Sequence, residues 1–246
     1  MKLTVLGNWG PYPTAGGACS GYLFEGEGAK ILIDCGNGTL SRLQQVLTSL
    51  EELDLIILSH LHSDHISDAM VLRYAIGINK MKGLFHKTIP LYAPATPQGD
   101  FEKLQFENAF LIQAIEENLV VHEQGLKISF KKMDHPVETY AIGIENKEKK
   151  FVFSADTRYC SQLIDFSKNA DLLLCEAGVL ERDKTATTPH LSAMEAGQVA
   201  TQGHVKKLLL THFWPGYNLQ EILDEAGSAY DGQLILSEEM KSYPIG

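Results

Sequence analysis

One short segment, dense in side chains that bind metal ions, constrains this sequence more than any other feature. Residues 59–65 are Ser-His-Leu-His-Ser-Asp-His, and they follow directly after an apolar run. Imidazole nitrogens and carboxylate oxygens are the ligands that zinc and similar divalent ions accept. A turn from a strand into a helix can point alternate side chains in two directions, so we expect His60 and His62 to face one ion. Asp64 and His65 would then face a second ion.

Two ions need more ligands than one turn supplies, and three further candidates follow later apolar runs. His135 follows the run 126–133, Asp156 follows 151–154, and His212 follows 207–210. Loops converge where strands end, so we expect these side chains to meet the histidine segment. Any one of them has an alternative explanation as an ordinary loop or capping residue. Their repeated placement at strand ends favours a shared site.

The hydrophobic pattern predicts a mixed α and β fold. We expect strands at 3–6, 31–34, 53–58, 89–92, 126–133, 140–145, 151–154, 172–174, 207–210 and 234–236, and helices at 40–50, 67–78, 192–201 and 218–230. Capping-box patterns begin two of these helices, at Ser192 with Glu195 and at Asn218 with Glu221. The glycine-bearing stretch 7–21 is expected to be a surface loop that could rim a site. Strands in adjacent pairs and strands followed by helices indicate mixed sheets with helices on their outer faces, in a single domain of residues 1–246.

Composition narrows the function classes. The 21 basic and 31 acidic residues give a formal charge of −10, which disfavours binding of long nucleic acid through a basic surface. No apolar run approaches the roughly 20 residues that span a bilayer, and the N-terminal apolar stretch is too short for a signal peptide. The four cysteines are scattered and contain no CxxC pair. We therefore expect a cytoplasmic protein with reduced thiols and no membrane partner.

The segment 60–65 and three others resemble the metallo-β-lactamase superfamily. Its HxHxDH turn is matched in full, and residues 32–36, 153–157 and 210–213 are similar to its early strand, its bridging-aspartate motif and its final histidine motif. The resemblance implies a four-layer αββα sandwich of the α+β class with a dinuclear metal site between the sheets. It implies His60, His62, His135 and Asp156 on the first ion, and Asp64, His65, His212 and Asp156 on the second.

Within this superfamily, residues 34–39, 135–140 and 189–192 look like ribonuclease Z and its short cyclic-phosphodiesterase relatives. That resemblance implies that His190 is an extra acid or phosphate contact and that Glu176 supports it. The alternatives are a surface histidine beside a helix and an ordinary acid at a strand end. Asp64 would orient the nucleophilic water as well as bind metal, and Asp34 would anchor the histidine turn. True β-lactamases typically carry cysteine where Asp156 stands, which makes lactam hydrolysis the weaker expectation.

The spacing of the motifs limits the substrate. Ribonuclease Z carries a long arm for tRNA between the positions that match His135 and Asp156, but here these residues are only 156 − 135 = 21 positions apart. We therefore expect a phosphodiesterase that cleaves a small or cyclic nucleotide-type phosphodiester through a hydroxide shared by two metal ions. The ions are expected to be Zn²⁺, with Mn²⁺ or Fe as alternatives, and the resemblance also implies a homodimer.

Other functions remain open at this point. A thioester or lactone hydrolase of the same superfamily is the main alternative, and a metal-bearing binding or scaffold protein is a third. Four aromatic residues, Trp214, Tyr217, Tyr74 and Phe85, are candidates to line a pocket that stacks a base. The alternative for these four is ordinary packing in the core or at a rim.

Overall fold

The computed structural model describes residues 1–246 and contains two mixed sheets of seven strands each. The first sheet has the order β14 (Ser242–Pro244), β1 (Lys2–Gly7), β2 (Gly21–Gly26), β3 (Ala29–Cys35), β4 (Leu55–Ile57), β5 (Ile89–Ala93), β6 (Phe110–Ala114). The second has the order β13 (Gln233–Leu236), β12 (Lys207–Thr211), β11 (Leu172–Glu176), β10 (Lys150–Phe153), β9 (Tyr140–Glu145), β8 (Leu126–Lys132), β7 (Val120–Glu123). Within each sheet, the outer strands on one side are parallel and those toward the other side are antiparallel.

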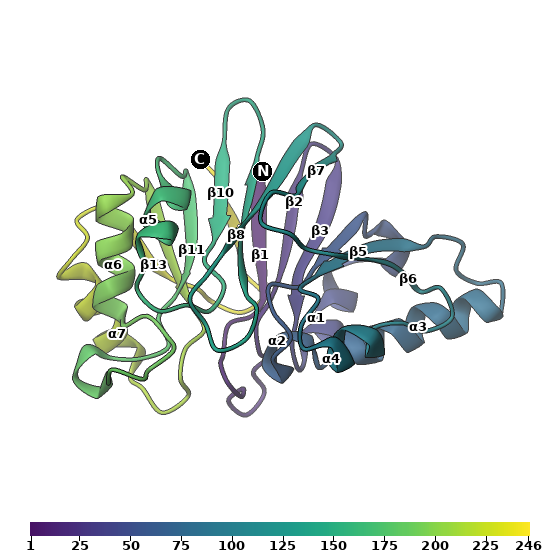
Figure 1. The fold of residues 1–246 in the computed structure, drawn as a ribbon, viewed down its shortest axis with the longest axis horizontal. Helices are drawn as coiled ribbons and strands as arrows, with labels where there is room; N and C mark the ends of the chain where they lie inside the picture. The colour runs from purple at the N-terminus through teal and green to yellow at the C-terminus, as the bar shows by residue number, and fades with distance from the viewer.

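Helices cover the outer face of each sheet, which gives the predicted αββα sandwich (Figure 1). On the first sheet lie α1 (Thr39–Val46), η1 (Leu50–Glu52), α2 (Ser63–Ile66), α3 (Ala69–Met81) and α4 (Gln98–Lys103); on the second lie α5 (Ser161–Ser167), η2 (Glu181–Asp183), α6 (Ala193–Gln202) and α7 (Leu219–Gly227). The capping box predicted at Ser192 is present. Asn218 caps α7 differently, by accepting a hydrogen bond from the amide of Gln220.

The alternation of side chains along β3 explains why the sheets stack. Ile31 and Ile33 point into the core between the two sheets, and Leu32 points into the core beneath the helices of the first sheet. Across the gap between the sheets, Tyr22 lies against Phe153 with ring centroids 5.2 Å apart. Because both faces of such a strand are covered, it forms a nearly continuous apolar run in the sequence.

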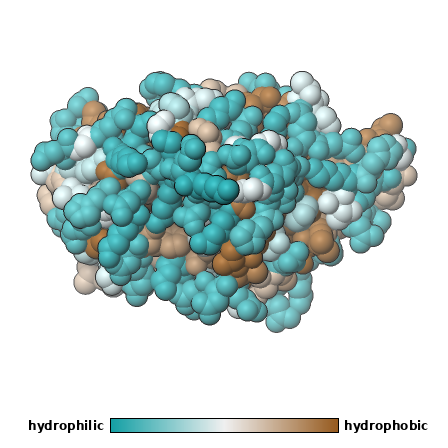
Figure 2. Space-filling view, turned by 90° about the horizontal axis from the view of Figure 1, so that it is seen from above, coloured by the Kyte–Doolittle hydropathy of each residue, from teal (hydrophilic) through white to brown (hydrophobic).

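The loops that carry the predicted site residues emerge at one end of the sandwich. In Figure 1 this is the lower end, where α2 lies, while the turn between β9 and β10 and both chain termini lie at the upper end. Figure 2 shows that the upper end is mostly hydrophilic, with small scattered apolar patches. None of the helices combines the length and the apolar composition of a membrane-spanning segment. The architecture therefore gathers the chemistry-bearing loops at the end opposite the termini.

Candidate metal centre and active site

The histidine segment forms the turn that leads from β4 into the short helix α2. His62 is the last residue before the helix and has an extended backbone, and the amide of His65 donates to its carbonyl oxygen at 3.0 Å. The rings of His60 and His65 are completely buried. The turn thus holds two imidazoles inside the protein.

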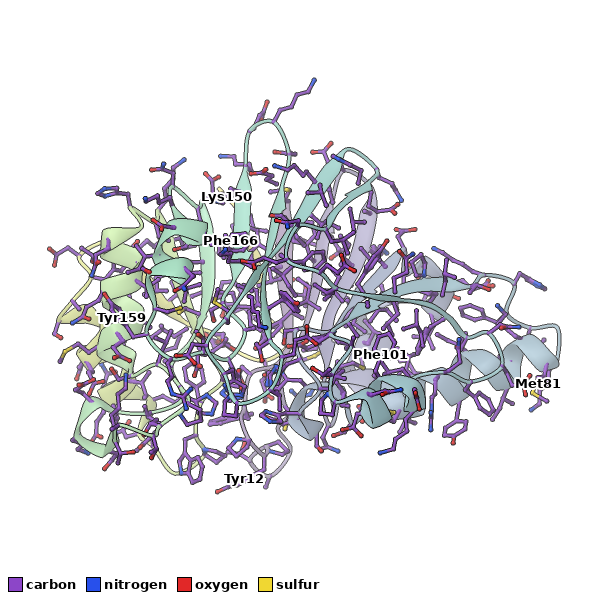
Figure 3. All side chains as sticks on the ribbon, in the orientation of Figure 1. Tyr12, Met81, Phe101, Lys150, Tyr159 and Phe166 are labelled. Atoms are coloured by element: carbon purple, nitrogen blue, oxygen red, sulfur yellow. The ribbon has the colours of Figure 1, made fainter.

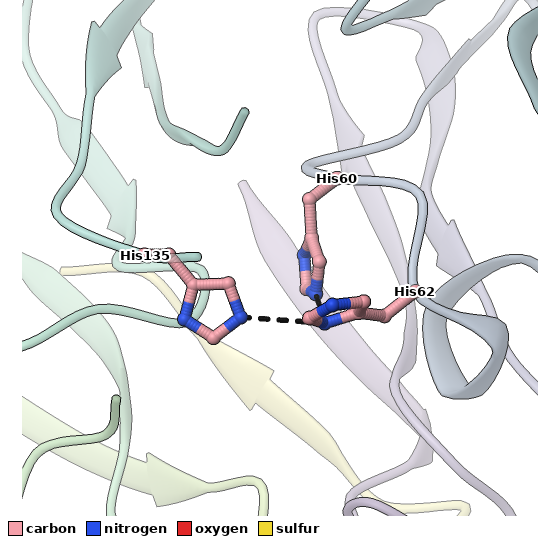
Figure 4. A group of neighbouring side chains, drawn as sticks. All are labelled: His60, His62 and His135. Atoms are coloured by element: carbon pink, nitrogen blue, oxygen red, sulfur yellow. Dashed lines mark hydrogen bonds between the residues drawn. The ribbon is translucent and has the colours of Figure 1, made fainter. Parts of the chain in front are cut away.

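His135 joins His60 and His62 from the opposite sheet. Figure 4 shows the three rings converging, with His60 and His62 on one side of the gap and His135 on the other. The nitrogens His60 Nε2 and His62 Nδ1 lie 3.1 Å apart, and His62 Nδ1 and His135 Nε2 lie 3.3 Å apart. Burial lowers the pKa of all three, that of His135 to about 4. Neutral imidazoles whose nitrogens face one another are suited to bind a cation.

Asp156 lies between this group and a second one. Its Oδ2 atom is 3.7 Å from His60 Nε2, 3.4 Å from His65 Nε2 and 3.4 Å from His212 Nε2. On the far side, His212 Nε2 is 3.2 Å from Asp64 Oδ2. Burial would raise the pKa of Asp156, but the surrounding histidines outweigh that effect and hold its pKa well below the ordinary value. The carboxylate is therefore placed to bridge two groups of ligands.

The polar atoms at this centre fit bound divalent metal. His65 Nε2 and Asp156 Oδ1 are buried and make no hydrogen bond. Such atoms usually have a partner in folded proteins, and a cation coordinated by nitrogen and oxygen would supply one here. Four overlapping groups of these side chains have ligand atoms within 4.8 Å of one another. They are His60, His62 and His135; His60, His65 and Asp156; Asp64, His65 and His212; and Asp156, His190 and His212.

Asp34 fixes the orientation of the histidine turn. Its fully buried carboxylate accepts hydrogen bonds from the amide of Ser59 at 2.7 Å, from the Ser59 hydroxyl at 2.8 Å and from His65 Nδ1 at 2.7 Å. With Nδ1 donating to Asp34, the other ring nitrogen of His65 is left to face the centre. The anchoring role expected for Asp34 therefore matches its contacts.

Glu176 and His190 form a pair beside this centre. Glu176 is fully buried at the end of β11, where it accepts from the amide of Thr157 at 2.7 Å and from His190 Nδ1 at 3.0 Å. The His190 ring stacks on His212 with centroids 5.2 Å apart. Burial disfavours the imidazolium, but the Glu176 carboxylate outweighs it and raises the pKa of His190 to about 9.

A pocket of about 360 Å³ opens above these side chains. Its lining consists of Pro11, His62, Ser63, Asp64, His135, Pro136, Asp156, Pro189, His190 and His212. No lysine or arginine lines it. The remaining histidines, His86, His122 and His204, are exposed and belong to none of the potential metal groups. Six of the residues that the sequence singled out for chemistry line the pocket: His62, Asp64, His135, Asp156, His190 and His212. The other three, His60, His65 and Glu176, are buried behind it.

The loop 8–19 is the part of the site that sequence reasoning located least well. Gly10 lies so close to His212 that a Cβ atom on it would be 2.0 Å from His212 Nε2. The Gly10 amide donates to the Phe213 carbonyl at 3.1 Å, which holds the loop against the final histidine motif. Pro11 then forms part of the pocket wall. The sequence predicted a surface loop that could rim a site, but nothing in it indicated a contact with His212.

Comparisons with known proteins agree with this geometry. Residues 29–213 match the family model described as "Beta-lactamase superfamily domain". The chain is 33% identical to "Probable metallo-hydrolase YhfI" of Bacillus subtilis, over 97% of each chain, and the crystal structure of YhfI superposes with a TM-score of 0.93 over 98% of each chain. It is 24% identical to the ribonuclease Z of Thermobifida fusca, over 97% of this chain and 93% of that protein. The short form of human tRNase Z shares the fold, with a TM-score of 0.79 and 21% identity over the whole of both chains.

Proposed function

The chain belongs to the β-lactamase superfamily as a metallo-hydrolase, and from that premise we propose that it is a phosphodiesterase acting on a small or cyclic nucleotide-type phosphodiester. The ribonuclease Z relatives support the choice of phosphodiester chemistry, since their name describes enzymes that cleave such bonds in RNA. The alternative, a thioester or lactone hydrolase, has no observation in its favour beyond the shared fold.

We assign the ligands to two divalent ions, with Zn²⁺ the expected metal because the donors are mainly imidazoles. His60, His62, His135 and Asp156 would hold the first ion, and Asp64, His65, His212 and Asp156 the second. When bound, the ions would supply a strong nucleophile at neutral pH and offset charge on the phosphoryl oxygens. Asp64 would have a further role, since it lines the pocket and its carboxylate can orient the attacking water.

The observation that carries the proposal is the pairing of His190 with Glu176 at the wall of the pocket. Because His190 Nδ1 donates a hydrogen bond to Glu176, His190 Nε2 is the nitrogen left to donate a proton to the departing oxygen. The alkoxide that leaves a phosphodiester needs such a proton, whereas the thiolate of a thioester is a good leaving group without one. A proton donor held by a buried carboxylate therefore favours phosphodiester cleavage over thioester hydrolysis, while the ribonuclease Z relatives favour it over hydrolysis of a lactone, which also releases an alkoxide.

The size and charge of the site support a small substrate. Between His135 and Asp156 the chain forms only the β9–β10 hairpin, with the tip of its turn at the opposite end of the sandwich (Figure 1). No tRNA-binding arm exists in this segment. The pocket volume lies in the range of small-molecule sites, and its wall carries no lysine or arginine to track a polyphosphate chain.

The proposal is tested first by metal content and substrate range. We expect two ions per chain and turnover of bis-p-nitrophenyl phosphate, with little or no activity on a thioester or a β-lactam. Asp156→Ala should lose metal and this turnover together. Turnover confined to the thioester would overturn the phosphodiesterase assignment, and a protein that binds no metal would overturn the mechanism.

The kinetics of His190→Ala on two substrates distinguish a general-acid role of His190 from a purely structural role. A general acid contributes about 10²- to 10⁴-fold, and only where the leaving group needs a proton. We expect that loss in kcat for a 2′,3′-cyclic nucleotide, whose leaving group is an alkoxide, and a much smaller loss for bis-p-nitrophenyl phosphate. His204→Ala, at an exposed histidine remote from the pocket, is the matched control. Equal losses on both substrates, with the metal retained, would refute the acid role.

A further inference from the structure

Two exposed aromatic side chains stand together beside the pocket. Tyr12 is 50% exposed and Trp214 is 41% exposed, although both are large and partly apolar. Their ring centroids are 5.7 Å apart and their planes meet at 74°, an edge-to-face pair. Such a pair leaves ring surface open to solvent on which another flat ring can stack.

The position of the pair connects it to the site already described. Tyr12 directly follows Pro11, which lines the pocket, and Trp214 lies two residues beyond His212. The two segments are bound to each other, because the Gly10 amide donates to the Phe213 carbonyl and the Phe213 amide donates to the Asn8 carbonyl at 2.9 Å. Figure 3 shows Tyr12 at the lower edge of the molecule, the end at which the site loops emerge. The aromatic pair therefore stands at the rim of the pocket.

Local contacts hold Trp214 in place. Its indole lies over Gly216, where a Cβ atom would come within 2.7 Å of the indole nitrogen. The turn is closed by the Tyr217 amide, which donates to the Trp214 carbonyl at 3.1 Å, and the Tyr217 hydroxyl donates to Asp183 at 2.9 Å. A ring held in this way loses little freedom when a ligand stacks on it.

The pocket itself lacks the groups that usually give affinity for a nucleotide. Its wall has no lysine or arginine, and its ten lining residues are histidines, aspartates, prolines and one serine. Discrimination between phosphodiesters must therefore come from contacts outside the reacting centre. The aromatic pair is the exposed apolar surface next to that centre.

We propose that Tyr12 and Trp214 form a base-stacking subsite, so that the substrate is a phosphodiester of a nucleoside with its base on the aromatic pair and its phosphoryl group in the pocket. This inference rests on the proposed function and narrows its substrate class. Aromatic rings stack on every base, so the subsite would favour nucleosides over base-free phosphodiesters without selecting strongly among bases.

The test compares two cyclic phosphodiesters with the metal-loaded full chain. Adenosine 2′,3′-cyclic phosphate carries a base, and glycerol 1,2-cyclic phosphate does not. We expect Trp214→Ala to lower the ratio of kcat/KM for the first substrate to that for the second by about tenfold, through KM. Trp214→Phe should restore most of the ratio, and Tyr12→Ala should lower it less. The control is Tyr74→Ala, since Tyr74 is 42% exposed but lies on α3 against Phe106.

A binding measurement keeps this inference separate from the proposed function. The chain has two tryptophans, so adenosine 5′-monophosphate should quench the fluorescence of the metal-loaded wild type more than ribose 5-phosphate does. Trp214→Phe should remove that difference. If the wild type cleaves no phosphodiester, the proposed function fails while this measurement still reports on the subsite. An unchanged substrate ratio in Trp214→Ala, or quenching that is equal for the two phosphates, would overturn the subsite.

Discussion

Asp34→Asn is the substitution for which the structure gives the most specific expectation. The Asp34 carboxylate is fully buried and accepts three hydrogen bonds, two from Ser59 and one from His65. Its φ of 53° lies in the left-handed region, which asparagine tolerates, so the substitution adds no backbone strain. The side-chain oxygen of an asparagine can still accept the hydrogen bond from the Ser59 backbone amide. Its NH₂ group then faces His65 Nδ1, which is itself a hydrogen-bond donor.

The size of the effect follows from these contacts. The two hydrogen bonds to Asp34 Oδ2 lose their charged acceptor, at a cost of about 1.5 kcal/mol each, so we expect the free energy of unfolding of the metal-free protein to fall by about 3 kcal/mol. To avoid two facing donors, His65 must move its proton to Nε2, the nitrogen that would hold metal. Loss of a carboxylate that orients a histidine ligand typically costs about 10- to 100-fold in metal affinity.

Urea unfolding of the metal-free protein and zinc competition against a chelating dye measure the two effects. Ser59→Ala is the comparison variant, because it removes the hydroxyl's contacts with Asp34 and with His60 Nδ1 at 3.1 Å but leaves the hydrogen bond from His65 to Asp34. It should cost stability with a much smaller change in zinc affinity. The reasoning is refuted if Asp34→Asn binds zinc as tightly as the wild type, or if Ser59→Ala loses as much affinity.

Three other predictions concern stability. His204 is exposed just beyond α6 with a φ of 49°, so His204→Gly should raise the free energy of unfolding by about 1 kcal/mol in urea titration; no gain would mean that the position is unstrained. Tyr22→Phe leaves the buried Thr211 hydroxyl without its partner at 2.7 Å, and should lower the unfolding free energy by about 1–2 kcal/mol, whereas an unchanged midpoint would show that the hydroxyl finds another partner. Zinc at a hundredfold excess over its Kd should stabilise the wild type in thermal unfolding by about 2.7 kcal/mol for each bound ion, so by about 5 kcal/mol for two, and Asp156→Ala much less; equal shifts would contradict the assigned ligands.

Most of the strands and the four longest helices could be predicted from hydrophobic spacing, but the shortest and most exposed elements could not. The predicted strand 53–58 is only Leu55–Ile57, because Leu53 caps the end of η1 before it and the residues after it lead into the histidine turn. The strands β6 and β7 were missed, since they lie at sheet edges and have few buried side chains. The strand β2 was missed as well, although it is largely buried, because it begins and ends with glycine. Pairing with a neighbour, more than local preference, makes such segments into strands.

The aromatic residues show the same limit. Of the four that were candidates to line a pocket, Phe85 lies in the core beneath the helices of the first sheet. Tyr74 lies on α3, where its ring packs against Phe106. Trp214 stands at the rim, but its partner there is Tyr12, which no sequence pattern singled out. The two residues are 202 positions apart, so only the tertiary fold brings them together.

The sequence by itself determined the α and β layers and which side chains are candidates to bind metal. Those features depend on the local sequence, namely the spacing of apolar residues and the strand-to-helix turn that carries His60, His62, Asp64 and His65. The resemblance to a known family led us to expect Asp156 beside both groups of ligands and Glu176 beside His190, and the tertiary structure supplies the distances between them. Only the tertiary structure decided that Gly10 rests against His212. These contacts join distant segments, and they form because two separately patterned sheets bury their apolar faces against each other and bring their loops to one end.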